Sequence, residues 1–134
     1  MIDPILIKAY LTTDYKVFNP ILVIRIGQNN LDLDKFLILN HARDWAYITA
    51  YNPGSKLLSK EENEISHQKL LEEVVDYKIW EGEGITNNST WEPEKSLLIL
   101  GISKENAIRV SSKFGQNAFV FGETGKIAEL IQLA

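Results

Sequence analysis

The chain has 134 residues, of which 45% are hydrophobic and 24% are charged, as is usual for one globular domain with its own core. It contains no cysteine, which excludes disulfides, a thiol nucleophile and zinc or iron–sulfur sites built from cysteine. Its net charge of -4, without any basic cluster, argues against nucleic acid as a partner.

The sequence also lacks the signals of export and of membrane insertion. The N-terminus, M-I-D-P-I-L-I-K, has no basic segment followed by the long apolar run of a secretion signal. No apolar stretch approaches the roughly 20 residues that a membrane-spanning helix needs. We therefore expect a single cytoplasmic domain over residues 1–134, with no membrane partner and with an oligomeric state that the sequence does not indicate.

The first elements are predicted to be two helices with a hairpin between them. Asp3, followed by proline, is typical of a helix N-cap, although residues 5–7 could instead begin a strand. Residues 15–18 and 21–26 are rich in strand-forming residues and are separated by Asn-Pro, which indicates a hairpin. Asn30 can cap a short helix with apolar residues on one side.

The central unit is predicted to be a strand, a tight loop and a helix. Residues 45–51 are aromatic, β-branched or small and carry no charge, which fits a strand covered on both faces. Pro53 and the glycine after it end this strand. Ser59 and Glu62 have the S-x-x-E spacing of a capping box, and the helix that follows has one apolar face, which includes Asn63 and His67.

The second half is predicted to repeat this pattern. Residues 77–80 predict a short strand, and residues 81–90, the most polar and turn-prone segment, predict a mobile loop. Residues 97–100 form a continuous apolar run typical of a central strand. Ser103 caps the next helix, and residues 118–121 predict another buried strand. The last residues predict an edge strand or a short helix.

Two strand–helix–strand units in succession favour an α/β or α+β fold. We expect one compact domain with a mixed sheet, parallel central strands joined by right-handed crossovers, and two to four packing helices. The N-terminal hairpin would add antiparallel strands at one edge.

Familiar catalytic motifs are missing from the sequence. His41 and His67 are the only histidines and are 26 positions apart, so neither belongs to a metal-binding cluster. The G-x-S-x-G, H-E-x-x-H and Walker lysine motifs do not occur. Gly82 and Gly84 form only a fragment of a dinucleotide-binding fingerprint. The sequence therefore predicts no metal site and no cofactor.

Polar residues gather at two places in the predicted sheet. If residues 45–51 and 97–100 are parallel, Asn52, Ser55, Ser59 and Ser103 follow their carboxyl ends at one edge, where helix N-termini suit an anion. Ser59 and Ser103 are better read as caps alone, while Asn52 and Ser55 can be read either as ligand contacts or as parts of a turn. The opposite edge would carry Glu94, Ser96, Gln116 and Asn117. The side-chain amides of Gln116 and Asn117 could read a polar ligand or could simply complete a helix end.

These polar positions fall in strings that resemble a family of short bacterial proteins known only as a domain of unknown function. The most specific strings are T-A-Y-N-P-x-S at residues 49–55 and F-G-Q-N-A at residues 114–118. Further matches are Ala9-Tyr10, Thr13-x-Tyr15, Arg25-Ile26-Gly27, Leu58-Ser59, Glu62-Asn63, Gly82-x-Gly84 and W-x-P-E-x-S at residues 91–96. The resemblance implies a small cytoplasmic protein without an assigned activity or cofactor. It adds Arg25, Thr49 and Glu62 to the polar positions of interest.

Three functions are compatible with these residues. The first is a binding module for a polar or anionic small molecule or a peptide segment, with the candidate residues Arg25, Asn52, Ser55, Glu62, Asn63, Glu94, Ser96, Gln116 and Asn117. The second is an enzyme that uses Glu62 or Glu94 as a base. The third is a protein-interaction subunit with an exposed apolar patch around Tyr77, Trp80 and Trp91. The absence of an evident nucleophile favours the binding module.

Overall fold

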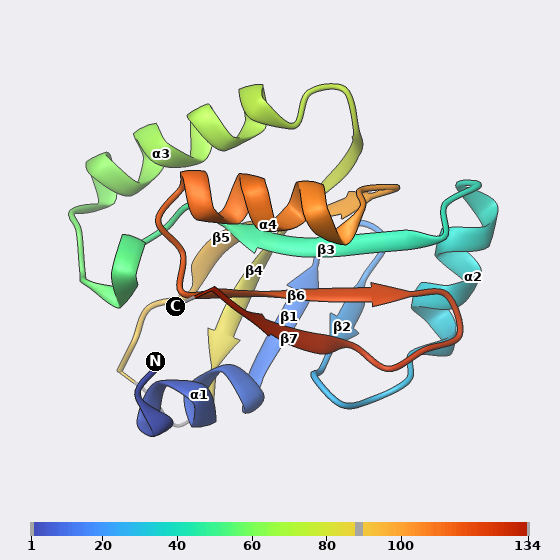
Figure 1. Ribbon diagram of the computed structural model, residues 1–134, viewed down its shortest axis with the longest axis horizontal. Helices are drawn as coiled ribbons and strands as arrows, with labels where there is room; N and C mark the ends of the chain where they lie inside the picture. The colour runs from blue at the N-terminus through green and yellow to red at the C-terminus, as the bar shows by residue number, and fades with distance from the viewer. Residues whose placement is uncertain (1, 88–89, 134) are drawn as a thin grey trace.

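The computed structural model describes residues 2–87 and 90–133, and these form a single α+β domain (Figure 1). The helices are α1 (Pro4–Leu11), α2 (Leu31–Leu39), α3 (Lys60–Glu73) and α4 (Lys104–Lys113), with a short 3-10 turn, η1 (Pro53–Ser55). The strands are β1 (Thr13–Val17), β2 (Leu22–Ile24), β3 (Asp44–Thr49), β4 (Lys78–Thr86), β5 (Glu94–Leu100), β6 (Ala118–Glu123) and β7 (Glu129–Gln132).

All seven strands lie in one sheet, in the order β2-β1-β4-β5-β3-β6-β7. Every neighbouring pair of these strands is antiparallel, so the prediction of a mixed sheet with parallel central strands was wrong. The sheet curls into a half-barrel. Its two edges approach each other at an isolated bridge between Ile26, beyond β2, and Ala128, before β7. The amide of Gly27 donates to the carbonyl of Ala128 at 2.8 Å and helps to hold these two edges together.

The error about strand direction has a simple cause. β3 and β4 are joined by α3 and point the same way, as a strand–helix–strand unit should, but β5 lies between them. In the same way β5 and β6 are joined by α4 and point the same way, with β3 between them. Each unit is therefore split by a strand of the other, which is the split β-α-β arrangement of ferredoxin-like domains. Sequence patterns indicate the relative direction of the two strands in a strand–helix–strand unit, but they do not indicate whether another strand lies between those two.

The individual helices and turns follow their sequence signals closely. Asp3 and Asn30 cap α1 and α2, and the capping box at Ser59 and Glu62 is present at the start of α3. One segment differs from its prediction: residues 81–86 belong to β4 and not to a loop, while residues 88 and 89 lie outside the described chain. The glycines and carboxylates of this segment fit a strand because β4 pairs on both sides, with β1 and β5.

The two faces of the sheet bury separate cores. α3 and α4 lie together over one face (Figure 1), where Leu70 and Val110 pack against Ile48, Ile99 and their neighbours. The concave face holds a second core around Trp45, Tyr47 and Leu98. α2 closes one end of this concave side with Leu33 and Leu37, while α1 lies at the other end. Burial on both faces explains why β3, β5 and β6 read as continuous apolar runs.

The close approach of β1 and β4 requires a glycine at position 82. A Cβ atom added there would lie 1.8 Å from the carbonyl oxygen of Lys16, to which the Tyr47 hydroxyl donates at 2.6 Å. At Gly84, two residues along the same strand, an added Cβ would meet only Thr13 and Tyr15 at 3.6 and 3.9 Å, which is ordinary contact.

We therefore predict that Gly82→Ala destabilises the protein by more than about 4 kcal/mol, since main-chain atoms must move. Gly84→Ala should change the free energy of unfolding by less than about 1 kcal/mol. Urea denaturation followed by circular dichroism measures both variants. Equal effects of the two substitutions would contradict the register of β1 against β4.

Candidate functional site

The antiparallel sheet brings the two predicted groups of polar residues to the same edge. Thr49 at the end of β3 pairs with Ser96 at the start of β5, and β6 begins on the other side of β3. Asn52 and Ser55 therefore lie beside Glu94, Ser96 and Gln116 rather than across the sheet from them. The predicted grouping with Ser103 was wrong, because Ser103 follows the opposite end of β5.

A cavity of about 180 Å³ lies where these strand ends meet the underside of α1. On five strands the lining residues are two positions apart and so share the concave face. These pairs are Thr13 and Tyr15, Tyr47 and Thr49, Gly84 and Thr86, Glu94 and Ser96, and Ala118 and Val120. About six water molecules occupy this volume in liquid water, at roughly 30 Å³ each. The cavity therefore suits only a compact ligand.

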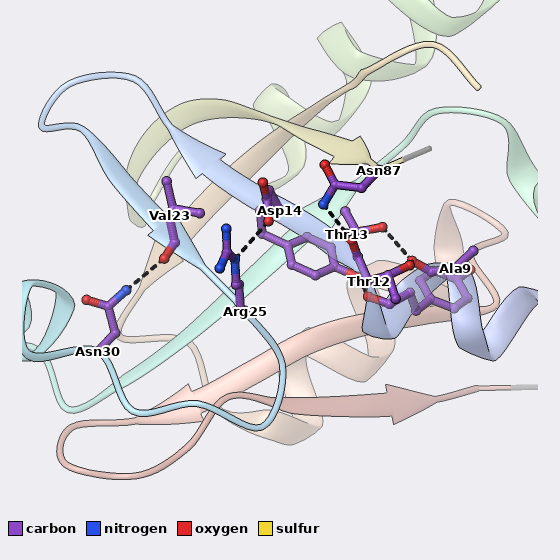
Figure 2. Close-up of polar contacts among 10 residues, drawn as sticks. Ala9, Thr12, Thr13, Asp14, Val23, Arg25, Asn30 and Asn87 are labelled. Carbon is purple, nitrogen blue, oxygen red and sulfur yellow. Dashed lines mark hydrogen bonds and ion pairs between the residues drawn. The ribbon is translucent and has the colours of Figure 1, made fainter. Parts of the chain in front are cut away.

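Helix α1 forms one wall of the cavity through Leu6, Ala9 and Tyr10, yet it has no buried residue of its own. Its C-terminal turn is held by side chains of β1, since Thr13 donates to the Ala9 carbonyl at 2.7 Å and Tyr15 donates to the Tyr10 carbonyl at 2.8 Å. Figure 2 shows the Thr13 contact and the Asn87 amide that donates to the Thr12 carbonyl. These bonds attach the C-terminal end of α1 to β1, and the buried Ile2 precedes its N-terminal end.

Asn52 is the polar centre of the corner between β3 and α3. Its backbone is left-handed, with φ at 47°, a region that asparagine tolerates better than most residues. Its side-chain oxygen accepts from the Leu58 amide at 3.0 Å and from the Asn63 side chain at 2.9 Å. Its backbone N–H donates to the side-chain oxygen of Asn63 at 2.9 Å, and its side-chain nitrogen donates to Glu94 at 2.7 Å. The corner, α3 and β5 are therefore tied through one side chain.

Glu94 is the carboxylate of the cavity. Its Oε2 atom accepts from Asn52 at 2.7 Å and from the Trp91 indole at 3.0 Å, while its Oε1 atom accepts no hydrogen bond from the residues that the structure describes. Burial raises the pKa of Glu94 above its usual value, and the two donors oppose this shift in part by stabilising the charged form. A perturbed carboxylate in a cavity is a typical feature of functional sites.

Three tyrosines of the cavity, Tyr15, Tyr47 and Tyr51, donate their hydroxyl hydrogens to other parts of the chain. Tyr47 donates to the Lys16 carbonyl, and Tyr51 donates to Glu64 at 2.6 Å. Burial raises the pKa of Tyr15, Tyr47 and Tyr51, so all three stay neutral. Their rings thus contribute neutral aromatic surface to the cavity wall.

The turn before β6 completes the site. The side-chain nitrogen of Gln116 donates to the carbonyls of Tyr51 at 3.0 Å and Phe114 at 3.4 Å, which leaves the side-chain oxygen of Gln116 without a donor among the described residues. Asn117 donates to the Ser55 hydroxyl at 3.0 Å. Asn117 therefore supports the wall from behind, while Gln116 lines the cavity.

Two of the predicted candidate residues lie away from the cavity. Arg25 lies beyond the end of β2 and pairs with Asp14 of β1 at 2.9 Å (Figure 2). Glu62 is exposed and completes the capping box of α3. Asn63 is buried directly behind Asn52 and does not line the cavity.

Sequence reasoning did not select the aromatic and helical part of the wall. The sequence predicts no role at a site for Tyr10, Tyr15, Tyr47 and Tyr51. A signal was present for the last two, because residues four apart on a strand share a face and Thr49 lies between them on that face. Nothing local indicated that α1 would lie against them.

The chain was also compared with known proteins. A family model described as "Protein of unknown function (DUF3293)" matches residues 48–119, just over half of the chain. The chain belongs to the DUF3293 family. The match begins within β3 and ends within β6, so it contains the Asn52 corner, Glu94 and Gln116. The N-terminal strings at residues 9–15 and 25–27 lie outside it. No curated protein and no solved structure matched the chain.

The DUF3293 description assigns no activity. Within residues 2–87 and 90–133, no group of three or more histidine or acidic side chains is placed to hold a metal ion. No helix in that part of the chain is long and apolar enough to cross a membrane.

We predict that Asn63→Ala lowers the free energy of unfolding by about 2–4 kcal/mol. The substitution removes both contacts to Asn52 and leaves a buried amide unpaired, and each such group costs on the order of 1–3 kcal/mol. Gln68→Ala, on the exposed side of the same helix, should change stability by less than about 0.5 kcal/mol. Chemical denaturation compares the two, and similar values for both would contradict the role of the Asn52–Asn63 pair.

We also predict a pH-dependent effect of Glu94→Gln. Because the folded chain raises the pKa of Glu94 above 4.5, the wild-type protein loses stability as the pH rises through that interval. The variant lacks this loss, so its stability relative to wild type should increase from pH 4 to pH 7, by about 1.4 kcal/mol for each unit of pKa elevation. Urea denaturation at several pH values tests this. A difference that is constant with pH would contradict it, and Glu92→Gln at the exposed neighbouring position is the control.

Proposed function

We propose that this protein binds a compact small molecule in the cavity beneath α1. The observation that carries the proposal is the Glu94 carboxyl group, which is largely buried at the junction of several strands and has one oxygen left unpaired by the described residues. Burying a carboxylate without a full set of partners costs free energy. A ligand that satisfies the free oxygen would recover part of that cost.

The surroundings of Glu94 support a binding role. Asn52 is held by four hydrogen bonds and so fixes the orientation of the carboxyl group before any ligand arrives. The remaining wall is largely aromatic and apolar, as in most small-molecule sites, with a few polar groups that fix orientation. A rigid polar anchor inside an apolar wall favours recognition of one ligand geometry.

A second candidate function is acid–base catalysis by Glu94. Its raised pKa brings the carboxyl group closer to neutral pH, where it can exchange a proton with a bound molecule. Glu62, the other carboxylate considered as a base, caps α3 on the surface and is a poor candidate. Turnover of a bound compound by wild-type protein, lost in Glu94→Gln while binding persists, would support this function.

The interaction-subunit hypothesis has less support. Trp80 packs edge-on against Phe36 at 4.7 Å on the concave side, while Tyr77 packs against the core under α3 and α4. Trp91 lines the cavity. The three aromatic residues therefore do not gather into one exposed apolar patch.

Screening a fragment library by two-dimensional NMR tests the binding proposal. We expect hits that shift the backbone amides of Asn52 and Gln116, and we expect Ala9→Leu to weaken them at least tenfold by filling the cavity from α1. Lys8→Leu, on the exposed part of the same helix, is the matched control and should leave binding unchanged.

Gly84→Ala narrows the cavity from the opposite wall and gives a second blocking variant that does not alter α1. The proposal fails if no fragment shifts these amides, or if the hits bind both blocking variants as tightly as they bind wild type.

A further inference from the structure

We infer that the ligand of this cavity is a small organic cation, held by a protonated amine that donates to the free Oε1 atom of Glu94. This inference rests on the proposed function and narrows it to one chemical class. It departs from the expectation of an anionic ligand, and it depends on the charges, hydrogen bonds and rings of the cavity wall.

The charged groups of the cavity wall favour a cation. Among the described lining residues Glu94 is the only acid, and lysine, arginine and histidine are absent from the lining. Lys95, which follows Glu94 in the sequence, is held by Glu64 at 2.8 Å, and Arg25 is held by Asp14. An ionised Glu94 thus has no counter-ion in the described chain, which disfavours an anion and favours a cation.

The hydrogen-bond donors of the wall are mostly used by the fold. The hydroxyl of Ser96 donates to the Glu94 carbonyl at 3.0 Å, and that of Thr49 donates to the Lys95 carbonyl at 2.6 Å. Thr13 donates to a carbonyl of α1, so in its contact with Thr86 the Thr86 hydroxyl must be the donor. The hydroxyls of the tyrosines on the strands also donate to other parts of the chain.

Acceptors, in contrast, remain available. Among the described residues no donor reaches Oε1 of Glu94 or the side-chain oxygen of Gln116, whose nitrogen is committed to two backbone carbonyls. Among the described residues the uncommitted donors are one amide hydrogen of Asn52 and the hydroxyl of Tyr10, to which the Ser55 hydroxyl is hydrogen-bonded, and hydroxyls can also accept. A ligand that brings donors therefore completes the site, and a protonated amine brings up to three.

The aromatic wall suits the same ligand. Tyr15 and Tyr47 lie edge to face at 5.4 Å, and Tyr10, Tyr51 and Trp91 complete the aromatic lining. Neutral aromatic rings attract a cation through their quadrupole while they accommodate its carbon chain. The volume of about 180 Å³ limits the ligand to a small amine.

The closing experiment titrates wild-type protein with butylammonium at pH 7 and follows the amide shifts of the cavity residues. Butanol and butyrate serve as the neutral and anionic probes of similar size, and tetramethylammonium serves as a cation without N–H groups. We expect butylammonium to bind at least tenfold more tightly than butanol or tetramethylammonium, and butyrate not to bind. Glu94→Gln should weaken butylammonium at least tenfold, whereas Glu92→Gln should change its affinity by less than twofold.

The pH dependence gives a second readout that needs no variant. The titratable groups near Glu94 are Tyr10 from α1, Tyr15 from β1 and Tyr51 after β3. All three are neutral below pH 8 because their pKa values are raised. The amine stays protonated over this range, with a pKa near 10.4 as in lysine. Affinity should therefore fall as the pH drops from 7 to 4 and Glu94 takes up a proton.

The outcomes separate the two proposals. If butanol or butyrate binds as tightly as butylammonium and Ala9→Leu blocks it, the cation inference is overturned and the binding cavity stands. If the cation binds equally well to Glu94→Gln, or with no pH dependence, the inference is overturned as well. If neither this series nor the fragment library binds, both proposals are overturned.

Discussion

The structure around the candidate site depends on the buried left-handed corner at Asn52. A chain that leaves β3 has to reverse within a few residues to start α3, and Asn52, Gly54 and Ser55 all adopt positive φ to do so. Non-glycine residues rarely adopt this conformation unless their surroundings compensate. Here the hydrogen bonds that Asn52 makes with Asn63, Leu58 and Glu94 compensate for the strain. The same bonds shape the corner and fix the carboxyl group of the cavity.

The corner is also joined to the turn before β6, a neighbour that is remote in sequence. The amide of Gly54 donates to the carbonyl of Gly115 at 2.8 Å, and Gln116 donates to the carbonyl of Tyr51. The two most specific strings of the sequence, at residues 49–55 and 114–118, are thus in direct contact. This contact favours glycine at position 115, because Gly115 has φ at 69° and a side chain there would press on Pro53.

Sequence reasoning succeeded for the local signals of the helix caps, but it failed for the turn-prone residues 81–86, which form part of β4, and for the strand order. Caps at Asp3, Asn30, Ser59 and Ser103 act within three residues, so all four helices could be placed from them. The insertion of β5 between β3 and β4 leaves no local trace, since a strand buried on both faces is apolar whether its neighbours are parallel or antiparallel. For the same reason the polar residues of the site could be named, while their meeting at one edge and the tyrosines around them could not.

The chemical bias of the cavity follows from the way the fold uses its polar groups. An antiparallel half-barrel with a helix across its open end needs donors to attach that helix and to hold the strand ends, and the threonine and tyrosine hydroxyls of the concave face supply them. Each hydroxyl has a single hydrogen to give, so once it is committed to a carbonyl the group can only accept. The fold therefore leaves behind acceptors, rings and one carboxylate. If the proposed function holds, a site made in this way would recognise donors, because its own donors already hold the structure together.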